Sequence, residues 1–207
     1  MKIVAIITAR DNSKRFPNKS MQEIEGKPII QHIVGRLRLS QHIEEVAVAT
    51  STESPNIVKY CVENKIPCYQ GSETDIIDRL YKTAKSRKAD IIVRVWGDSP
   101  LIDVRFIDPF LQSFLAEMPD YASTKGLPWG NRFTIIRFKS LETIIEKMSA
   151  TDRSIWNKYD EDMIWRLLKM KVMVSTSHTD FSHLNFEVNT PEDLDRIRAI
   201  FAGEGDI

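Results

Sequence analysis

The sequence contains no long hydrophobic run and only two cysteines. No apolar stretch approaches the roughly 20 residues that a membrane-spanning helix needs, and the apolar run near the start is short and lacks the flanks of a signal peptide. Cys61 and Cys68 match no zinc or redox spacing, so we interpret them as small core residues in a reducing compartment. These absences predict a cytoplasmic protein that does not enter a membrane.

An excess of charge of either sign is also missing. The chain has 207 residues, and its 29 lysines and arginines balance 29 aspartates and glutamates. A general binder of nucleic acid or of anionic membranes needs an overall positive charge, so both classes are excluded. Any binding of phosphate must therefore come from a local cluster of cations.

Apolar segments alternate between strand-like and helix-like patterns over the first 118 residues. The predicted strands and helices, in turn, are strand 2–8, helix 29–37, strand 45–50, helix 54–62, strand 66–70, helix 72–85, strand 91–96 and helix 104–118. Within the helices we expect Val62 and Phe106 to face the core. This order predicts an α/β fold with a mostly parallel sheet and right-handed crossovers.

The chain beyond residue 118 is less regular. We predict a surface loop at 126–130, a strand at 134–137, a helix at 141–148, a loop at 150–162, a helix at 164–169, and strands at 172–174 and 186–188. Thr190 before Pro191 and two acidic residues predicts a capped final helix.

The loop after the first strand, residues 9–19, lacks glycine. It therefore matches neither of the two glycine-rich phosphate-binding loops, which argues against an NAD enzyme or a P-loop NTPase. The loop instead carries Arg10, Lys14, Arg15 and Lys19 against the single acid Asp11. Charge alone fits a phosphate cradle and a solvated basic loop equally well.

A second polar segment follows the strand at 91–96. Asp98, after Gly97, could bind Mg²⁺ from the tip of the strand, but Gly-Asp-Ser-Pro taken alone is better explained as a turn. We interpret Trp96 as a packing residue. Asp78 and Arg79, in the third helix, could form a surface ion pair.

Five blocks of the sequence belong together. The first is Ile7-Thr-Ala-Arg-Asp-Asn-Ser-Lys-Arg-Phe-Pro-Asn-Lys19. The others are Ile24-Glu-Gly-Lys-Pro-Ile-Ile30, Gly71-Ser-Glu-Thr-Asp-Ile-Ile-Asp-Arg79, Arg94-Val-Trp-Gly-Asp-Ser-Pro-Leu-Ile-Asp103 and Ser182-His-Leu-Asn-Phe-Glu-Val-Asn-Thr-Pro-Glu-Asp-Leu194. In this order they resemble the sugar-acid cytidylyltransferases, whose first block reads A-R-x-x-S-x-R-x-P-x-K. The nearest branch is the spore-coat polysaccharide biosynthesis type, related to acylneuraminate and 3-deoxy-manno-octulosonate cytidylyltransferases. The resemblance covers residues 1–118 and 181–201.

The resemblance implies a mostly parallel three-layer α/β sandwich of the nucleotide-diphospho-sugar transferase (GT-A-like) type. It implies transfer of CMP from CTP to an acidic sugar, with Mg²⁺ as cofactor and release of pyrophosphate, for surface glycan biosynthesis. The implied catalytic residues are Arg10, Lys19 and Asp98. The implied nucleotide-binding residues are Ala9, Arg10, Ser13, Arg15, Lys19, Ser72 and Arg79. The implied metal ligands are Asp98 and Asn189.

Asn189 departs from the family pattern, because it stands where the family has a second metal-binding aspartate. A glycosyltransferase on the same fold and a catalytically silent nucleotide-binding partner are the alternative interpretations. By analogy with the family we expect a homodimer. We further expect one nucleotidyltransferase domain over residues 1–207, with a less regular excursion for the acceptor or for oligomerisation at about 122–180.

Overall fold

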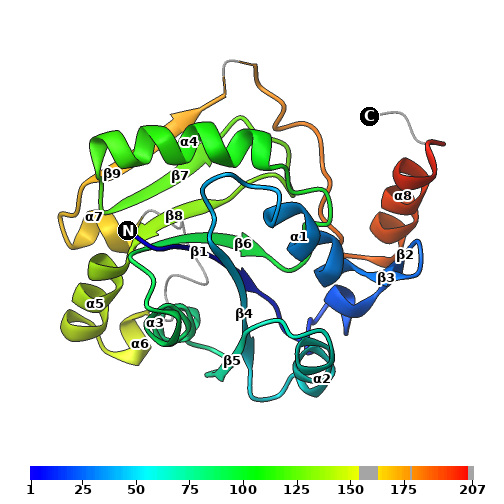
Figure 1. Ribbon diagram of the computed structural model, residues 1–207, viewed down its shortest axis with the longest axis horizontal. Coiled ribbons are helices and arrows are strands. Elements are labelled where there is room, and N and C mark those ends of the chain that lie inside the picture. The colour runs from blue at the N-terminus through cyan, green and yellow to red at the C-terminus, as the bar shows by residue number, and fades with distance from the viewer. Residues whose placement is uncertain (154–162, 178, 205–207) are drawn as a thin grey trace.

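A seven-stranded sheet forms the centre of the computed structural model, which describes residues 1–153, 163–177 and 179–204 (Figure 1). The strand order is β5-β4-β1-β6-β8-β7-β9, and in this described sheet β8 alone runs antiparallel to its neighbours. The strands are β1 (Ile3–Thr8), β4 (Glu45–Ser51), β5 (Cys68–Gly71), β6 (Ile91–Trp96), β7 (Tyr121–Lys125), β8 (Thr134–Arg137) and β9 (Val172–Thr176). A separate two-stranded ribbon pairs β2 (Glu23–Ile24) with β3 (Lys27–Pro28).

Helices cover both faces of the sheet. One face packs against α1 (Ile29–Leu37), α2 (Pro55–Glu63), α4 (Val104–Glu117) and α8 (Pro191–Ala202). The other packs against α3 (Ile76–Arg87), α5 (Phe138–Lys147) and α7 (Met163–Leu167). The short helices η1 (Lys19–Met21) and α6 (Ala150–Arg153) lie in connections. This is the three-layer, mostly parallel α/β sandwich expected from the sequence, and none of the described helices is long and apolar enough to span a bilayer.

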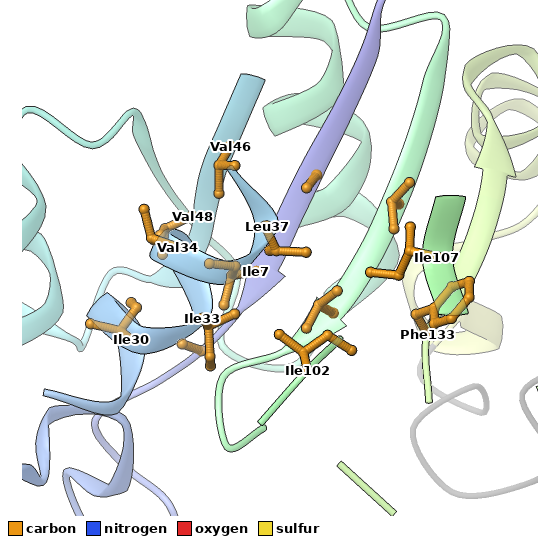
Figure 2. Packing of buried hydrophobic residues seen from close by; sticks show 14 of the residues in the cluster. Ile7, Ile30, Ile33, Val34, Leu37, Val46, Val48, Ile102, Ile107 and Phe133 are labelled. Carbon is orange, nitrogen blue, oxygen red and sulfur yellow. The ribbon is translucent and has the colours of Figure 1, made fainter. Parts of the chain in front are cut away.

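The first strand, β1, lies at the centre of both cores. Ile7 points into the first core, where Figure 2 shows it beside Ile33 and Leu37 of α1. Val4 and Ile6 point into the second core. Ile6 and Ile7 are fully buried, which confirms the prediction of a strand covered on both faces. Because β1 is central, the loop that leaves it is held at the middle of the sheet's carboxyl edge.

The prediction that two helix residues, Val62 and Phe106, face the core is wrong. Val62 is 72% exposed and Phe106 is 36% exposed. In α2 the buried positions are Ile57 and Cys61, four residues apart, so Val62 is rotated about 100° away from that stripe. Phe106 bears the same relation to Ile107 in α4.

The segment 126–130 is not the surface loop that its glycines and proline suggested. Leu127 is buried, whereas Trp129 is exposed. The backbone of Trp129 donates to Leu184 O at 3.0 Å and accepts from Phe186 N at 2.7 Å. Gly130 has φ +88°, and a Cβ there would lie 2.7 Å from the carbonyl carbon of Phe186. The segment is therefore packed directly against residues 184–187.

Other differences also fall in the second half of the chain. Residues 186–188 are irregular and not a strand. Ala150–Arg153 forms helix α6 instead of a loop, and 154–162, the rest of that predicted loop, lies outside the described residues. The strand β7 was not predicted.

The capped final helix is confirmed. Thr190 Oγ1 accepts from Asp193 N at 3.2 Å, and Asp193 Oδ2 accepts from Thr190 N at 3.1 Å, which together form a capping box. Asp193 Oδ2 also accepts from the backbone N–H of Asn189 at 3.0 Å. The start of α8 thus fixes the backbone of Asn189.

Candidate active site

The carboxyl ends of β1 and β6 meet at the centre of the sheet, where Thr8 pairs with Trp96. Gly97 N donates to Thr8 O at 2.9 Å, and Ser20 Oγ donates to Gly97 O at 2.6 Å. A Cβ on Gly97 would lie 2.5 Å from Ala9 Cβ, so only glycine lets the two strand ends approach this closely. The loop at 9–19 and the Gly97-Asp98 turn therefore line one site, at the edge where open α/β sheets bind ligands.

Asp11, the acid within the cationic loop, is a buried anchor. Its Oδ2 accepts from the backbone N–H of Asn56 at the start of α2 at 2.9 Å, and its own N–H donates to Ser54 Oγ at 3.0 Å. Its carbonyl oxygen accepts from the N–H groups of Ser13 and Asn18. Because a helix N-terminus stabilises a carboxylate, the loop's negative charge is held at the start of α2, while Arg10, Lys14 and Arg15 remain exposed.

A cavity of about 1370 Å³ lies over this edge. Among the described residues its charged lining comprises six cations, Arg10, Lys14, Arg15, Lys19, Arg79 and Arg94, and three acids, Glu53, Glu73 and Asp98. The local excess of positive charge contrasts with the zero net charge of the whole chain. This excess of positive charge favours the binding of a multiply charged anion, because it attracts such a ligand into the cavity.

Lys19 contacts both the turn after β6 and the segment before α8. Its ammonium group forms an ion pair with Asp98 Oδ2 and donates to Asn189 Oδ1 at 2.9 Å. Arg15 Nη2 donates to the same amide oxygen at 2.9 Å. Three segments far apart in the sequence therefore meet at one cation.

Glu187 is a site residue that the sequence reasoning missed. Its Oε2 accepts from Asn189 Nδ2 at 3.0 Å. Burial, followed by the charge of Asp98, raises the pKa of Glu187 above its ordinary value, while the hydrogen bond from Asn189 and the charge of Lys19 act in the opposite direction. The available signal was its position two residues before Asn189.

The far wall of the cavity is formed by the segment before α3. Arg10 Nη1 pairs with Glu73 Oε1 at 2.8 Å and joins this wall to the first loop. Arg79 is 2% exposed, and within the described structure its Nε and Nη1 atoms have no hydrogen-bond partner. Burial lowers the pKa of the Arg79 guanidinium, although Glu73 acts against this. Buried N–H groups without partners that line a cavity are typical of a site that accepts a ligand.

The predicted surface ion pair between Asp78 and Arg79 is wrong. Asp78 pairs instead with Lys82 at 2.9 Å on the outer side of α3. A Cβ on Gly71 would lie 2.8 Å from Arg79 Cγ, so the missing side chain at residue 71 makes room for the buried arginine.

Trp96 is more than a packing residue, because it lines the cavity. The guanidinium carbon of Arg94 lies 4.6 Å from the centroid of the Trp96 ring. Residues 94 and 96 lie two positions apart in β6, so their side chains face the same side of the sheet. Together they give the cavity a floor that is both aromatic and cationic.

Helix α6 contributes a further wall through Ala150 and Thr151. It is held by Arg153, whose Nη2 and Nε atoms lie 2.7 and 3.0 Å from Asp75 Oδ2. Asp75 is in turn the N-cap of α3 and accepts from Asp78 N through Oδ1. This buried ion pair fixes α6 beside the N-terminus of α3.

Most of the predicted site residues are brought together. Those that line the cavity are Ala9, Arg10, Ser13, Arg15, Lys19, Arg79 and Asp98. Asn189 reaches the site through Lys19 and Arg15. Ser72 is not among the lining residues, since its hydroxyl accepts from the backbone N–H groups of Thr74 and Asp75 and caps the turn before α3. Its neighbours Glu73 and Thr74 line the cavity instead.

The fold and the site define a mostly parallel α/β protein with a cationic cleft at the carboxyl edge of its central strands. A family model described as cytidylyltransferase matches residues 4–204. The chain therefore belongs to the cytidylyltransferase family.

Two relatives and one solved structure illustrate this membership. The chain is 38% identical over 117 residues to 3-deoxy-manno-octulosonate cytidylyltransferase of Geobacter metallireducens, a match that covers 56% of this chain and 46% of that protein. It is 23% identical over 216 residues to the spore coat polysaccharide biosynthesis protein SpsF of Bacillus subtilis, covering 99% and 88%. The structure of a cytidylyltransferase from Leptospira borgpetersenii superposes with a TM-score of 0.87 at 26% identity and covers 98% of this chain and 87% of that one. The match thus spans about half the length of the 3-deoxy-manno-octulosonate cytidylyltransferases and most of SpsF.

Proposed function

We propose that this protein transfers CMP from CTP to an acidic sugar, with release of pyrophosphate. The convergence of Arg10, Lys19 and Asp98 on one cationic cavity supports this proposal most directly. The names of the relatives point to the same chemistry, since they include cytidylyltransferases for 3-deoxy-manno-octulosonate and a protein of spore coat polysaccharide biosynthesis. A role in the synthesis of surface glycans follows from these relatives and is part of the proposal.

The residues of the cavity divide the work in this proposal. Arg10 and Lys19 bind the triphosphate and neutralise the charge that grows on the leaving pyrophosphate, assisted by Ser13 and Arg15. The N–H groups of Arg79 that have no partner in the described structure bind the base or ribose at the far wall. A displacement at phosphorus needs little covalent help from the protein, so positioning and charge neutralisation account for the catalysis.

The oxygen donors near Lys19 fit a magnesium ion. Asp98 offers a carboxylate and Asn189 an amide oxygen, and both already converge on one cation, the ammonium of Lys19. Among the described residues no group of three or more His, Cys, Asp or Glu side chains forms a metal cluster. One carboxylate and one amide oxygen suit Mg²⁺, which takes one or two carboxylates together with substrate phosphates. Bound there, Mg²⁺ would supply positive charge to the phosphate oxygens.

The proposal extends to the setting of the enzyme. CTP and sugar acids are soluble anions, so we place the reaction in the cytoplasm. We also propose a homodimer with its interface in the 122–175 region, by analogy with the family. Sedimentation of the purified protein would test the oligomeric state.

Nucleotide specificity gives the first test of the proposal. CTP with Mg²⁺ is expected to raise the melting temperature by about 5–10 °C at a concentration about 100 times Kd, since binding then stabilises the folded state by about 2.7 kcal/mol. UTP, GTP and ATP, and CTP without Mg²⁺, are expected to give much smaller shifts. Differential scanning fluorimetry with all four nucleotides, each with and without Mg²⁺, measures this directly. Equal shifts for all four nucleotides would contradict a cytidylyltransferase.

A further inference from the structure

Glu187 controls which end of the Asn189 amide faces the site. The amide nitrogen of Asn189 is committed to Glu187 Oε2 at 3.0 Å. Its oxygen is consequently turned to Lys19 Nζ and Arg15 Nη2, both at 2.9 Å. The partners leave no ambiguity, because a carboxylate can only accept and the two cations can only donate. With the carboxylate of Glu187 in place, Asn189 presents an oxygen to the site as an aspartate would.

The backbone fixes Glu187 beside Asp98. Val188, between Glu187 and Asn189, is fully buried, and its N–H donates to Asp98 O at 2.9 Å. Thr190 and Asp193 hold the following residues in the capping box of α8. The segment is therefore held against the turn after β6, and there the side chains of Glu187 and Asn189 meet.

Orientation of the amide does not by itself require a charged residue at 187. Any side chain that ends in a hydrogen-bond acceptor, such as glutamine, would hold Asn189 in the same way. A carboxylate at residue 187 adds a negative charge that glutamine would not supply. That charge suits a divalent cation bound beside Asp98, because such an ion is held by carboxylate oxygens.

We infer that Glu187 is the second carboxylate of the divalent-cation site and supplies, from two residues upstream, the negative charge that Asn189 lacks. Asp98 and Glu187 then contribute the two carboxylates, and Asn189 contributes a neutral oxygen that Glu187 orients. The inference rests on the proposed Mg²⁺-dependent binding of CTP. If Glu187 supplies the charge, the asparagine at residue 189 no longer argues for a catalytically silent protein.

The test is the dependence of CTP affinity on Mg²⁺, measured by calorimetry on the full chain without any acceptor. The quantity of interest is the ratio of the CTP Kd without Mg²⁺ to that with Mg²⁺, which reports the coupling between the two ligands. In Glu187→Gln the hydrogen bond to Asn189 is retained and the charge is lost. We expect this variant to reduce the ratio by about tenfold or more. In the double variant Glu187→Gln/Asn189→Asp the charge is moved to residue 189, and we expect the ratio to recover.

Glu192→Gln is the matched control. Glu192 is exposed at the first turn of α8, so the same change removes a nearby surface charge and should alter the ratio by less than about twofold. An unchanged ratio in Glu187→Gln would overturn the inference and leave the proposed function intact. CTP binding by the wild-type protein that does not respond to Mg²⁺ would overturn the inference together with the proposed metal. No binding of CTP under either condition would overturn both the inference and the proposed function.

Discussion

Replacing Arg10 with alanine is expected to slow pyrophosphate release from CTP on the order of 10²- to 10³-fold. Most of the loss should appear in kcat, because Arg10 is proposed to neutralise charge that grows on the leaving group as the bond breaks. The fold should tolerate the change: the Arg10 side chain is 44% exposed and pairs with Glu73 at the surface. Such a pair contributes less than about 1 kcal/mol to the free energy of unfolding. Steady-state kinetics with a coupled pyrophosphate assay would measure the effect.

Arg105→Ala provides the matched control for Arg10→Ala. Arg105 also forms an ion pair with one carboxylate, that of Asp103 at 2.6 Å, but it does not line the large cavity. Its loss should leave kcat within about twofold of the wild-type value. Similar kinetics for the two variants would mean that the cationic loop does not take part in the reaction.

Replacing Asp98 with asparagine is expected to have a comparable effect on turnover, also on the order of 10²- to 10³-fold. The variant keeps the size of the side chain and one oxygen, but it removes the charge that pairs with Lys19 and that is proposed to bind Mg²⁺. The Mg²⁺ concentration needed for half-maximal activity should rise as well. Because Lys19 loses its carboxylate partner, the free energy of unfolding should fall by about 1–3 kcal/mol. Activity titrations with Mg²⁺ and urea denaturation would measure the two effects separately.

Asp90→Asn is the control at the other end of the same strand. Asp90 precedes β6 at the amino edge of the sheet, where its Oδ2 accepts from Lys2 N at 2.7 Å. We expect turnover and the requirement for Mg²⁺ to be unchanged in this variant. An Asp98→Asn enzyme that behaved in the same way would show that Asp98 is only the turn residue that Gly-Asp-Ser-Pro suggests in isolation.

The sequence predicted local structure correctly where a residue pattern allowed only one interpretation. The apolar run of β1 predicted a strand buried on both faces, and Ile6 and Ile7 are fully buried. Thr190 and the acids after it predicted the cap of α8. Charge alone left the loop at 9–19 undecided between a phosphate cradle and a solvated loop. Its contacts with the rest of the site required the sheet, because only the pairing of β1 with β6 brings Asp98 next to Lys19.

The second half of the chain was predicted less well for a physical reason. Residues 126–130 have the composition of a surface turn, yet backbone hydrogen bonds of Trp129 hold them against Leu184 and Phe186. Contacts between distant irregular segments leave no periodicity to detect. The role of Glu187 was hidden in the same way. Its partner Asn189 was visible as a departure from the family, but the compensation depends on a side chain two residues away in an irregular segment.

The most direct measurement is the release of pyrophosphate by the wild-type protein from CTP and Mg²⁺ in the presence of a panel of sugar acids that includes 3-deoxy-manno-octulosonate. We expect at least one acid to give pyrophosphate and a CMP-sugar in equal amounts, and no release when Mg²⁺ is omitted. Binding of CTP without release of pyrophosphate for any member of a broad panel would contradict this expectation. Such a result would favour a glycosyltransferase or a silent nucleotide-binding partner on the same fold.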